Sequence, residues 1–208
     1  MARTTATFPS APTSITARTG RWTVRCSLSP RSGTRSTVGN YKAGFWYDDS
    51  QYVDFNTIAR GVAPGASRGN WGFYGLFDQV LVRFGGPGSN RGFGITGSVL
   101  VSPDQAVSVM PFFGTAGLVA RGVFASRPTD VVGLGVVYGR FSDDLQDSQR
   151  RAEQPVQEHE IALELTYRLR FLGSALFLQP DLQYIVRPGG TGQIGDAFVA
   201  GFQAGINL

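Results

Sequence analysis

The chain has 208 residues with 19 Lys and Arg, 15 Asp and Glu, one cysteine and one histidine. A single cysteine excludes a disulfide within the chain, and so few Cys and His ligands exclude a zinc site of the usual kind. Residues 1–37 hold six arginines and no acid, so the remaining 13 basic and 15 acidic residues give the body a net charge of −2. Nucleic-acid binding is not expected, because it needs a basic face on the folded body.

Residues 1–37 differ in composition from the rest of the chain. They are rich in Thr, Ser, Arg, Ala and Pro and have no hydrophobic period. This composition predicts a disordered or non-native basic leader, because it offers too little apolar surface to offset the entropy of ordering. Residues 1–20 also have no apolar core typical of a signal peptide. Two explanations stay open: a genuine basic tail, or a wrong start or frame that leaves residues 38–208 a fragment.

From residue 38 the sequence predicts eight strands and no helix. Apolar and polar residues alternate with a period of two, between breaks rich in Gly, Pro, Asn and Asp. The expected strands are residues 38–48, 70–83, 91–101, 107–119, 130–141, 157–171, 175–187 and 197–208. No apolar run reaches the roughly 20 residues of a transmembrane helix, but these strands have the length that crosses a bilayer at a tilt, about 9–11 residues.

The alternation is clearest in residues 157–171. One face carries Ile161, Leu163, Leu165, Tyr167, Leu169 and Phe171, and the other carries Glu158, Glu160, Ala162, Glu164, Thr166, Arg168 and Arg170. A soluble barrel turns its apolar face inward and a porin turns it toward lipid, so alternation alone does not separate them. Strand length, aromatic residues near strand ends and an apolar last strand favour an all-β, transmembrane antiparallel β-barrel.

Three motifs that could indicate chemistry fail on their context. The glycines of residues 92–97 match a dinucleotide fingerprint but lie inside a strand with no helix after them, so no cofactor is expected. Glu160 and Glu164 are four residues apart along a strand, about 13 Å, which is too far for a glycosidase pair. Asp143, Asp144, Asp147 and Glu153 form an acidic loop without calcium-binding spacing, so no metal is expected. The sequence therefore does not indicate an enzyme.

Several segments resemble the carbohydrate-selective porin (OprB-like) family. They are GNYKAGFWYDD at 39–49, GNWGFYGLFDQVLVR at 69–83, RGFGITGSVLVSPD at 91–104, RPTDVVGLGVVYGRFSDD at 127–144, EIALELTYRLRF at 160–171 and LFLQPDLQYIVRPGG at 176–190. The resemblance covers residues 38–208 and implies the C-terminal half of a barrel of about sixteen strands. It also implies a bacterial outer-membrane location and facilitated diffusion of carbohydrates.

The charged strand face is the candidate sugar path. Its members are Trp46, Glu160, Glu164, Arg168, Arg170, Asp181 and Arg187. Arginines can donate to sugar hydroxyls, carboxylates can accept from them, and the Trp46 ring can contact the apolar face of a sugar. The expected partners are sugars in transit and outer-membrane lipid, with homotrimer assembly left open. Two alternatives remain at this stage: a small structural outer-membrane barrel and a soluble lipocalin-like ligand-binding barrel.

Overall fold

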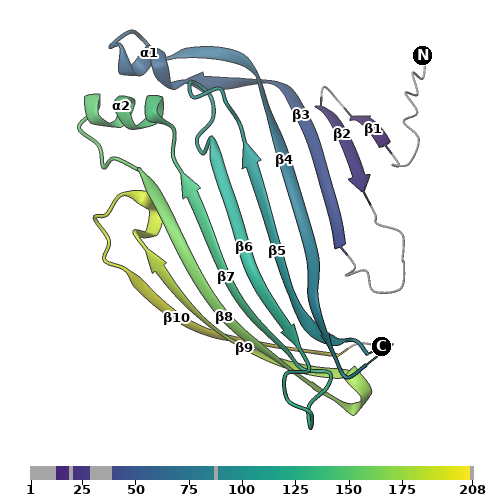
Figure 1. The fold of residues 1–208 in the computed structure, drawn as a ribbon. Coiled ribbons are helices and arrows are strands. Elements are labelled where there is room, and N and C mark those ends of the chain that lie inside the picture. Colours follow the sequence, from purple (N-terminus) through teal and green to yellow (C-terminus); the bar gives the residue numbers. More distant parts are fainter. Residues whose placement is uncertain (1–12, 19–20, 29–38, 87–88, 207–208) are drawn as a thin grey trace.

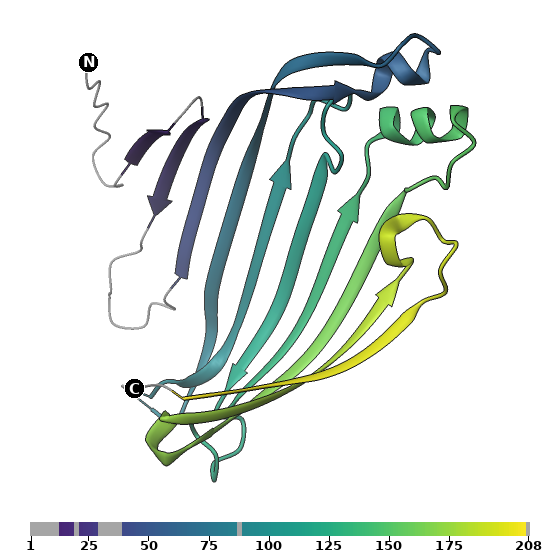
Figure 2. The same cartoon turned by 180° about the vertical axis from the view of Figure 1, so that it is seen from behind.

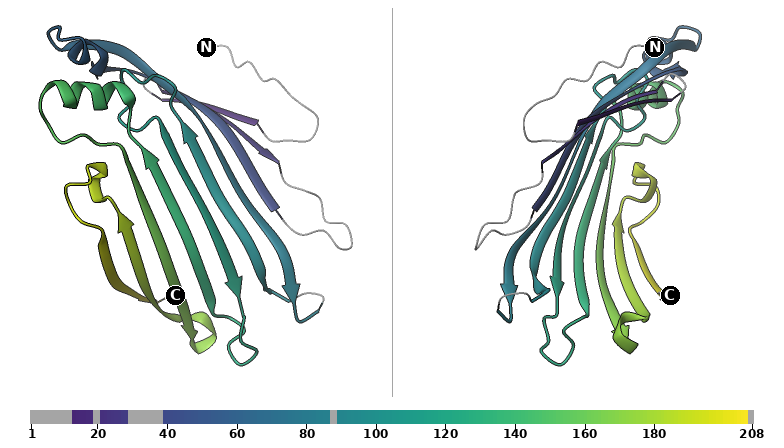
Figure 3. Two further views of the ribbon diagram at one scale, coloured as in Figure 1. Left: turned by 60° about the vertical axis from the view of Figure 1, so that its left-hand side comes forward. Right: turned by 90° about the vertical axis from the view of Figure 1, so that its right-hand side faces the viewer.

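The computed structural model describes residues 13–18, 21–28, 39–86 and 89–206, with side chains from residue 39 onward. Ten strands form one antiparallel sheet in chain order. They are β1 (Thr13–Arg18), β2 (Arg21–Leu28), β3 (Gly39–Asp54), β4 (Gly65–Phe84), β5 (Arg91–Val101), β6 (Phe112–Arg121), β7 (Val131–Arg140), β8 (His159–Phe171), β9 (Leu176–Val186) and β10 (Ala197–Ile206). Figures 1 and 2 show the strands side by side, and Figure 3 shows the sheet curving into an open trough.

All eight strands expected after residue 37 are present as β3 to β10. The largest shift is at the end of β3, which runs to Asp54 rather than to residue 48. Strand β6 begins at Phe112 rather than at residue 107, because residues 102–111 form a loop whose Pro111 has no N–H for a strand ladder. Strands β1 and β2 fall within the segment predicted as a leader, and β2 pairs with β3 along its length. The division of the chain at residue 37 stays a prediction.

The described residues include two α-helices, so the expectation of no helix was wrong. Helix α1 (Phe55–Ala59) follows β3, and helix α2 (Asp143–Arg151) follows β7 within the predicted acidic loop. The Ser142 hydroxyl accepts from the Leu145 N–H and caps α2. Acidic residues in the first turn of α2 and arginines in its last turn complement the helix dipole. Two short 3-10 turns, η1 (Leu172–Ser174) and η2 (Pro188–Gly190), connect later strands.

The buried side chains lie almost entirely in the loops at one end of the sheet. We call residues 55–64, 102–111, 141–158 and 187–196 the cap. Val107, Phe141 and Leu145 are the buried hydrophobic residues of the described part of the chain, and all three belong to the cap. Helices α1 and α2 pack together there, although their loops leave the sheet at different strands (Figure 1). The sheet itself is therefore a wall without an apolar core on either side.

Backbone hydrogen bonds join the loops of the cap to one another. The Phe55 N–H donates to the Ala106 carbonyl over 2.8 Å, and the Ser142 N–H donates to the Val109 carbonyl over 3.0 Å. A third bond runs 2.9 Å from the Glu158 N–H to Gly190. The opposite end of the sheet carries the shorter connections 85–90, 122–130 and 172–175. In the described ranges, no helix is long and apolar enough to cross a membrane.

Candidate functional site

Strand register assigns the side chains to two faces, because directly paired residues of antiparallel strands lie on the same face. Leu165 pairs with Leu134 on one side and with Leu182 on the other, and Leu134 pairs with Leu118. All four leucines are exposed. This side of the sheet, which we call the apolar face, therefore presents a band of leucines across β6 to β9.

Strand register also identifies the residues on the opposite side of the sheet, which we call the polar face. Glu164 pairs with Gln183 and with Gly135, and the register continues through Gly117 and Thr96 to Asp78. In β8 and β9 the polar side chains are half-buried, whereas four leucines on the other side are exposed, namely Leu163, Leu165, Leu178 and Leu182. A curved sheet produces this difference when its polar side is concave, because side chains converge there.

Six of the seven predicted site residues lie on the polar face. They are Trp46, Glu160, Glu164, Arg168, Arg170 and Asp181. Arg187 lies beyond the end of β9 at a φ of +56°, and its guanidinium pairs with Glu158 at 2.8 Å. Its backbone N–H donates to Asp196 over 3.1 Å. The structure therefore places Arg187 in the cap and the other six on the wall.

The Trp46 ring lies against the sheet over Gly72. A Cβ at residue 72 would be 2.8 Å from Trp46 Nε1 and 2.5 Å from the Val101 carbonyl oxygen, so only glycine leaves room for the ring. Tyr74 covers Gly44 in the same manner. These two aromatic rings therefore lie on the polar face of β3 and β4.

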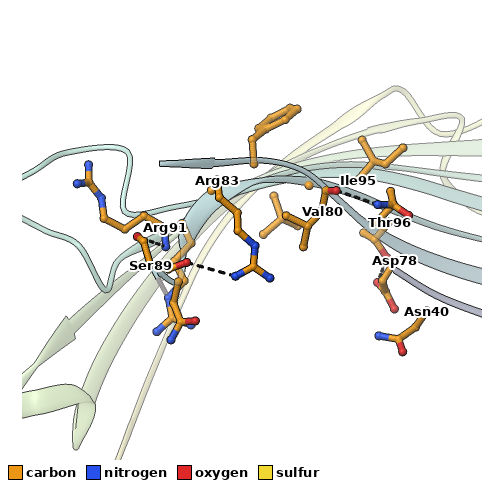
Figure 4. Close-up of a pocket in the computed structure, with 15 residues that line it drawn as sticks. Asn40, Asp78, Val80, Arg83, Ser89, Arg91, Ile95 and Thr96 are labelled. Atoms are coloured by element: carbon orange, nitrogen blue, oxygen red, sulfur yellow. Dashed lines mark hydrogen bonds between the residues drawn. The ribbon is translucent and has the colours of Figure 1, made fainter. Parts of the chain in front are cut away.

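A polar depression lies on the wall at the far end from the cap (Figure 4). It has a volume of about 370 Å³. Its polar-face lining includes Asn40, Asp78, Arg83, Thr96 and Arg121. The Thr96 hydroxyl donates to Asp78 over 2.6 Å, while Arg83 makes a long 3.4 Å contact with the Ser89 carbonyl.

Sequence reasoning missed Arg83 and Arg121 as residues of the polar face. A bulge between Val80 and Val82 shifts the register of β4 against β5. Simple alternation from Asp78 would put Arg83 on the apolar face, but after the bulge Arg83 pairs with Gly92 on the polar face. Arg121 ends β6, a strand whose sequence alternation is weak. In β4 the sequence contains one hint of an irregularity: Asp78 and Gln79 are consecutive polar residues and cannot both point to the same face of a regular strand.

The pKa of Asp144 in the cap and the pKa of Asp130 in the turn before β7 shift in opposite directions. Burial raises the pKa of Asp144 in α2, and the nearby charges of Asp147, Asp54, Asp104 and Asp143 raise it further. Burial alone would also raise the pKa of Asp130, but hydrogen bonds from Arg127, the Arg170 N–H and Tyr167 lower it below its ordinary value. Within the described ranges, no group of three or more His, Cys, Asp or Glu side chains could hold a metal ion.

Comparison with known families decides the family. Residues 5–208 match the family described as carbohydrate-selective porin, OprB family. This chain belongs to that family. The expected all-β, transmembrane antiparallel barrel fold is thereby confirmed, as is an outer-membrane location.

The chain is similar to two curated proteins. It is 29% identical to Porin B of Pseudomonas aeruginosa over 194 residues, which cover 84% of this chain and 42% of Porin B. It is 25% identical to the putative porin QuiX of Acinetobacter baylyi, covering 82% of this chain and 40% of that protein. The chain therefore spans less than half the length of these curated relatives.

A solved structure shows the same fold. The high pH structure of Pseudomonas putida OprB superposes with a TM-score of 0.81 at 26% identity, covering 88% of this chain and 47% of that one. The low pH structure of the same protein has a TM-score of 0.58 at 21% identity, which supports the fold alone. Both comparisons agree with a wall that forms about half of a porin barrel.

Proposed function

We propose that this chain forms part of the wall of an outer-membrane pore through which carbohydrates diffuse, with the polar face toward the lumen. The separation of the two faces carries the proposal: leucines are exposed on one side of β8 and β9, and charged and amide side chains line the other. A pore wall needs one apolar side and one polar side, because the first contacts lipid and the second contacts water and solute. The alternative of a soluble lipocalin-like barrel would require the apolar face inside.

The polar face offers both kinds of hydrogen-bonding group that a sugar needs. Arg168 and Arg170 supply donors for hydroxyl oxygens, and Glu160, Glu164 and Asp181 supply acceptors for hydroxyl protons. Arg168 already donates to the Gln179 side chain, and its guanidinium lies 4.9 Å from the Phe177 ring centroid. These contacts hold the guanidinium in a defined position, so that its remaining donors can meet a passing hydroxyl.

Trp46 would supply the apolar contact on the same path. The Nε1 edge of its indole lies over Gly72, and the side chain is half-buried on the polar face. Sugars have apolar ring faces as well as hydroxyls, and an indole surface can contact them without specific hydrogen bonds. Glu160 contributes differently, because its carboxylate accepts from the Gly189 N–H and so also fixes the turn η2.

The lipid contact and the oligomeric state belong to the same proposal. Lipid is expected on the apolar face, where Leu134 is 50% and Leu165 is 48% exposed, because a band of this kind matches the outer surface of a membrane barrel. A homotrimer is proposed from the family resemblance and would be tested by cross-linking in intact outer membranes. Trimer-sized products that depend on folded protein are the expected result.

Sugar flux tests the proposal directly. A chimera that joins this chain to the half of Porin B that it does not match would be produced in the outer membrane of a strain that lacks its own porins, and uptake of glucose and of larger neutral oligosaccharides would be measured. We expect glucose to enter and entry to fall with sugar size. If heat-modifiable, membrane-inserted protein leaves glucose uptake unchanged, the structural-barrel alternative is the better description.

A further inference from the structure

We propose that Arg83, Arg121 and Arg168 form an anion-binding row on the polar face that favours sugar acids, that is, polyhydroxylated monocarboxylates. We call these three residues the arginine row. The inference rests on the proposed function, because it names a class of sugar derivative that the same wall would recognise. It adds Arg83 and Arg121 to the path predicted from the sequence.

Strand register places the three arginines in one line across the sheet. The pairs are Arg83 with Gly92, Gly92 with Arg121, Arg121 with Val131, and Val131 with Arg168. Successive arginines are therefore two strands apart, a separation of about 10 Å. All three lie on the polar face, so their guanidinium groups rise from the same side of the wall. Beyond Arg168 the row continues to Gln179 of β9, whose side-chain oxygen accepts a hydrogen bond from Arg168.

The arginines are not neutralised by carboxylates. Among the ion pairs of the described residues, none involves Arg83, Arg121 or Arg168. The Nε of Arg121 is buried without a hydrogen-bond partner in the described part of the chain. A planar guanidinium binds a carboxylate through two parallel hydrogen bonds, and such charge-assisted bonds are stronger than neutral ones. Three guanidinium groups in a line, without an ion-pair partner among the described residues, are therefore suited to an anion.

The wall leaves room for a solute beside the row. Gly92 separates Arg83 from Arg121, and the next row of the polar face contains Gly94 and Gly133. The depression lined by Arg83 and Arg121 shares Thr96 and Val119 with a second depression of about 270 Å³ that reaches Glu164 and Thr166. A continuous shallow groove thus runs along the wall from the arginines toward the carboxylates.

The carboxylates at the other side of this groove define the class of anion. Register links Asp78 through Thr96, Gly117 and Gly135 to Glu164, so both acids lie in one row. Glu164 is four residues from Arg168 along β8, about 13 Å. A sugar acid could place its carboxylate on the arginines and donate hydroxyl protons to the acids. A second carboxylate at the other end of the sugar would be repelled there, which favours a monocarboxylate over a sugar dicarboxylate.

Equilibrium binding to the refolded 208-residue chain in detergent tests this inference. The probes are gluconate, glucose and the sugar dicarboxylate glucarate, at low salt and neutral pH. We expect gluconate to bind more tightly than either of the other two. Arg121→Gln should weaken gluconate binding by roughly tenfold, the loss expected for a charge-assisted hydrogen bond. Arg121→Lys should lose most of the same affinity, because a lysine cannot form the two-bond contact.

Lys42→Gln is the matched control. Lys42 pairs with Leu76 on the same face, three rows from the arginines, and the change removes one positive charge. We expect it to change gluconate affinity by less than about twofold, since solvent screens charges at that separation. If Arg121→Gln and Lys42→Gln weaken gluconate binding equally, the arginine row is not the binding site, and gluconate responds only to the overall positive charge of the wall. Equal affinity for glucose and gluconate, or tighter binding of glucarate, would overturn the sugar-acid assignment.

The proposed function and this inference can fail separately. Glucose uptake by cells tests the pore, whereas gluconate binding in detergent tests the row without requiring a pore. Gluconate binding with Arg121 dependence but no glucose uptake would reject the proposed pore alone. Glucose uptake without any preference for gluconate in binding would reject the row alone.

Discussion

Tyr167 donates its hydroxyl to the buried carboxylate of Asp130 over 3.0 Å, which ties β8 to the turn that precedes β7. Arg127 donates to the same carboxylate over 2.7 Å, and the Arg170 N–H donates over 2.9 Å. Asp130 is only 4% exposed. The Asp130 carboxylate thus accepts hydrogen bonds from Arg127 in the turn, from the backbone of β8 and from the Tyr167 hydroxyl. These bonds anchor the end of the wall opposite the cap.

Asp130→Asn should destabilise the fold. The amide keeps the size of the side chain but loses the charge and cannot accept from all of these donors, and Arg127 loses its ion-pair partner. We expect a loss of about 3 kcal/mol in the free energy of unfolding, as for a broken buried ion pair. Urea unfolding of the refolded protein in detergent would measure it. Asp143→Asn is the control, because its pair with Arg140 is exposed and should contribute less than about 1 kcal/mol. Equal losses in the two variants would contradict the anchor.

Acid should weaken this anchor. The pKa of Asp130 in the folded protein lies below its ordinary value of 3.8, because the hydrogen bonds outweigh burial. The carboxylate therefore contributes its stability above about pH 4 and loses it as the pH falls through the folded pKa. The urea midpoint of the unmodified protein should fall in this acid range. Asp130→Asn should show a smaller fall than Asp143→Asn, and identical acid profiles of the two variants would refute the linkage.

Asp144→Asn should stabilise the cap at neutral pH. Burial and four neighbouring carboxylates raise the pKa of Asp144, so its ionised form opposes folding. The unfavourable effect is present above the folded pKa and absent below the ordinary value of 3.8, where both states are protonated. The variant should therefore have a higher urea midpoint at pH 7 and no advantage at pH 3. A lower midpoint at pH 7 would show that Asp144 makes a favourable contact instead.

The two faces of β8 should respond oppositely to substitution. Leu165 is 48% exposed on the apolar face, and Leu165→Arg should impair assembly by about 2–4 kcal/mol if the residue lies near the middle of the bilayer. Arg168→Ala should leave assembly intact and change sugar flux, because it removes a donor from the lumen side. Heat-modifiability on gels measures assembly, and liposome swelling measures flux. Lost assembly in Arg168→Ala with a harmless Leu165→Arg would invert the faces.

Gly72→Ala should displace the Trp46 ring. The new methyl group would lie 2.8 Å from Trp46 Nε1 and 2.5 Å from the Val101 carbonyl oxygen. We expect a loss of about 1–3 kcal/mol from overpacking, with a changed near-ultraviolet circular dichroism signal. Gly135→Ala is the matched control on the same face, because its methyl group would meet only the Ala116 carbonyl oxygen at 3.9 Å. Equal effects of both substitutions would show that the ring does not need Gly72.

The sequence by itself determined the strands after residue 37 and the two faces of the last three. Alternation of period two in β8, β9 and β10 passes unchanged into the structure, because a regular strand turns successive side chains to opposite faces. Six of the seven predicted path residues therefore lie on one face. Arg187 does not, because the chain leaves the strand at Val186 and enters a left-handed conformation.

Tertiary structure decided how residues of different strands line up. The bulge at Leu81 brings Arg83 to the polar face, and strand register joins it with Arg121 and Arg168 in one row. The pairing of α1 with α2 likewise depends on contacts between distant loops. Alternation within one strand is local and readable from sequence, whereas register and bulges depend on hydrogen bonds between strands, which no single segment specifies.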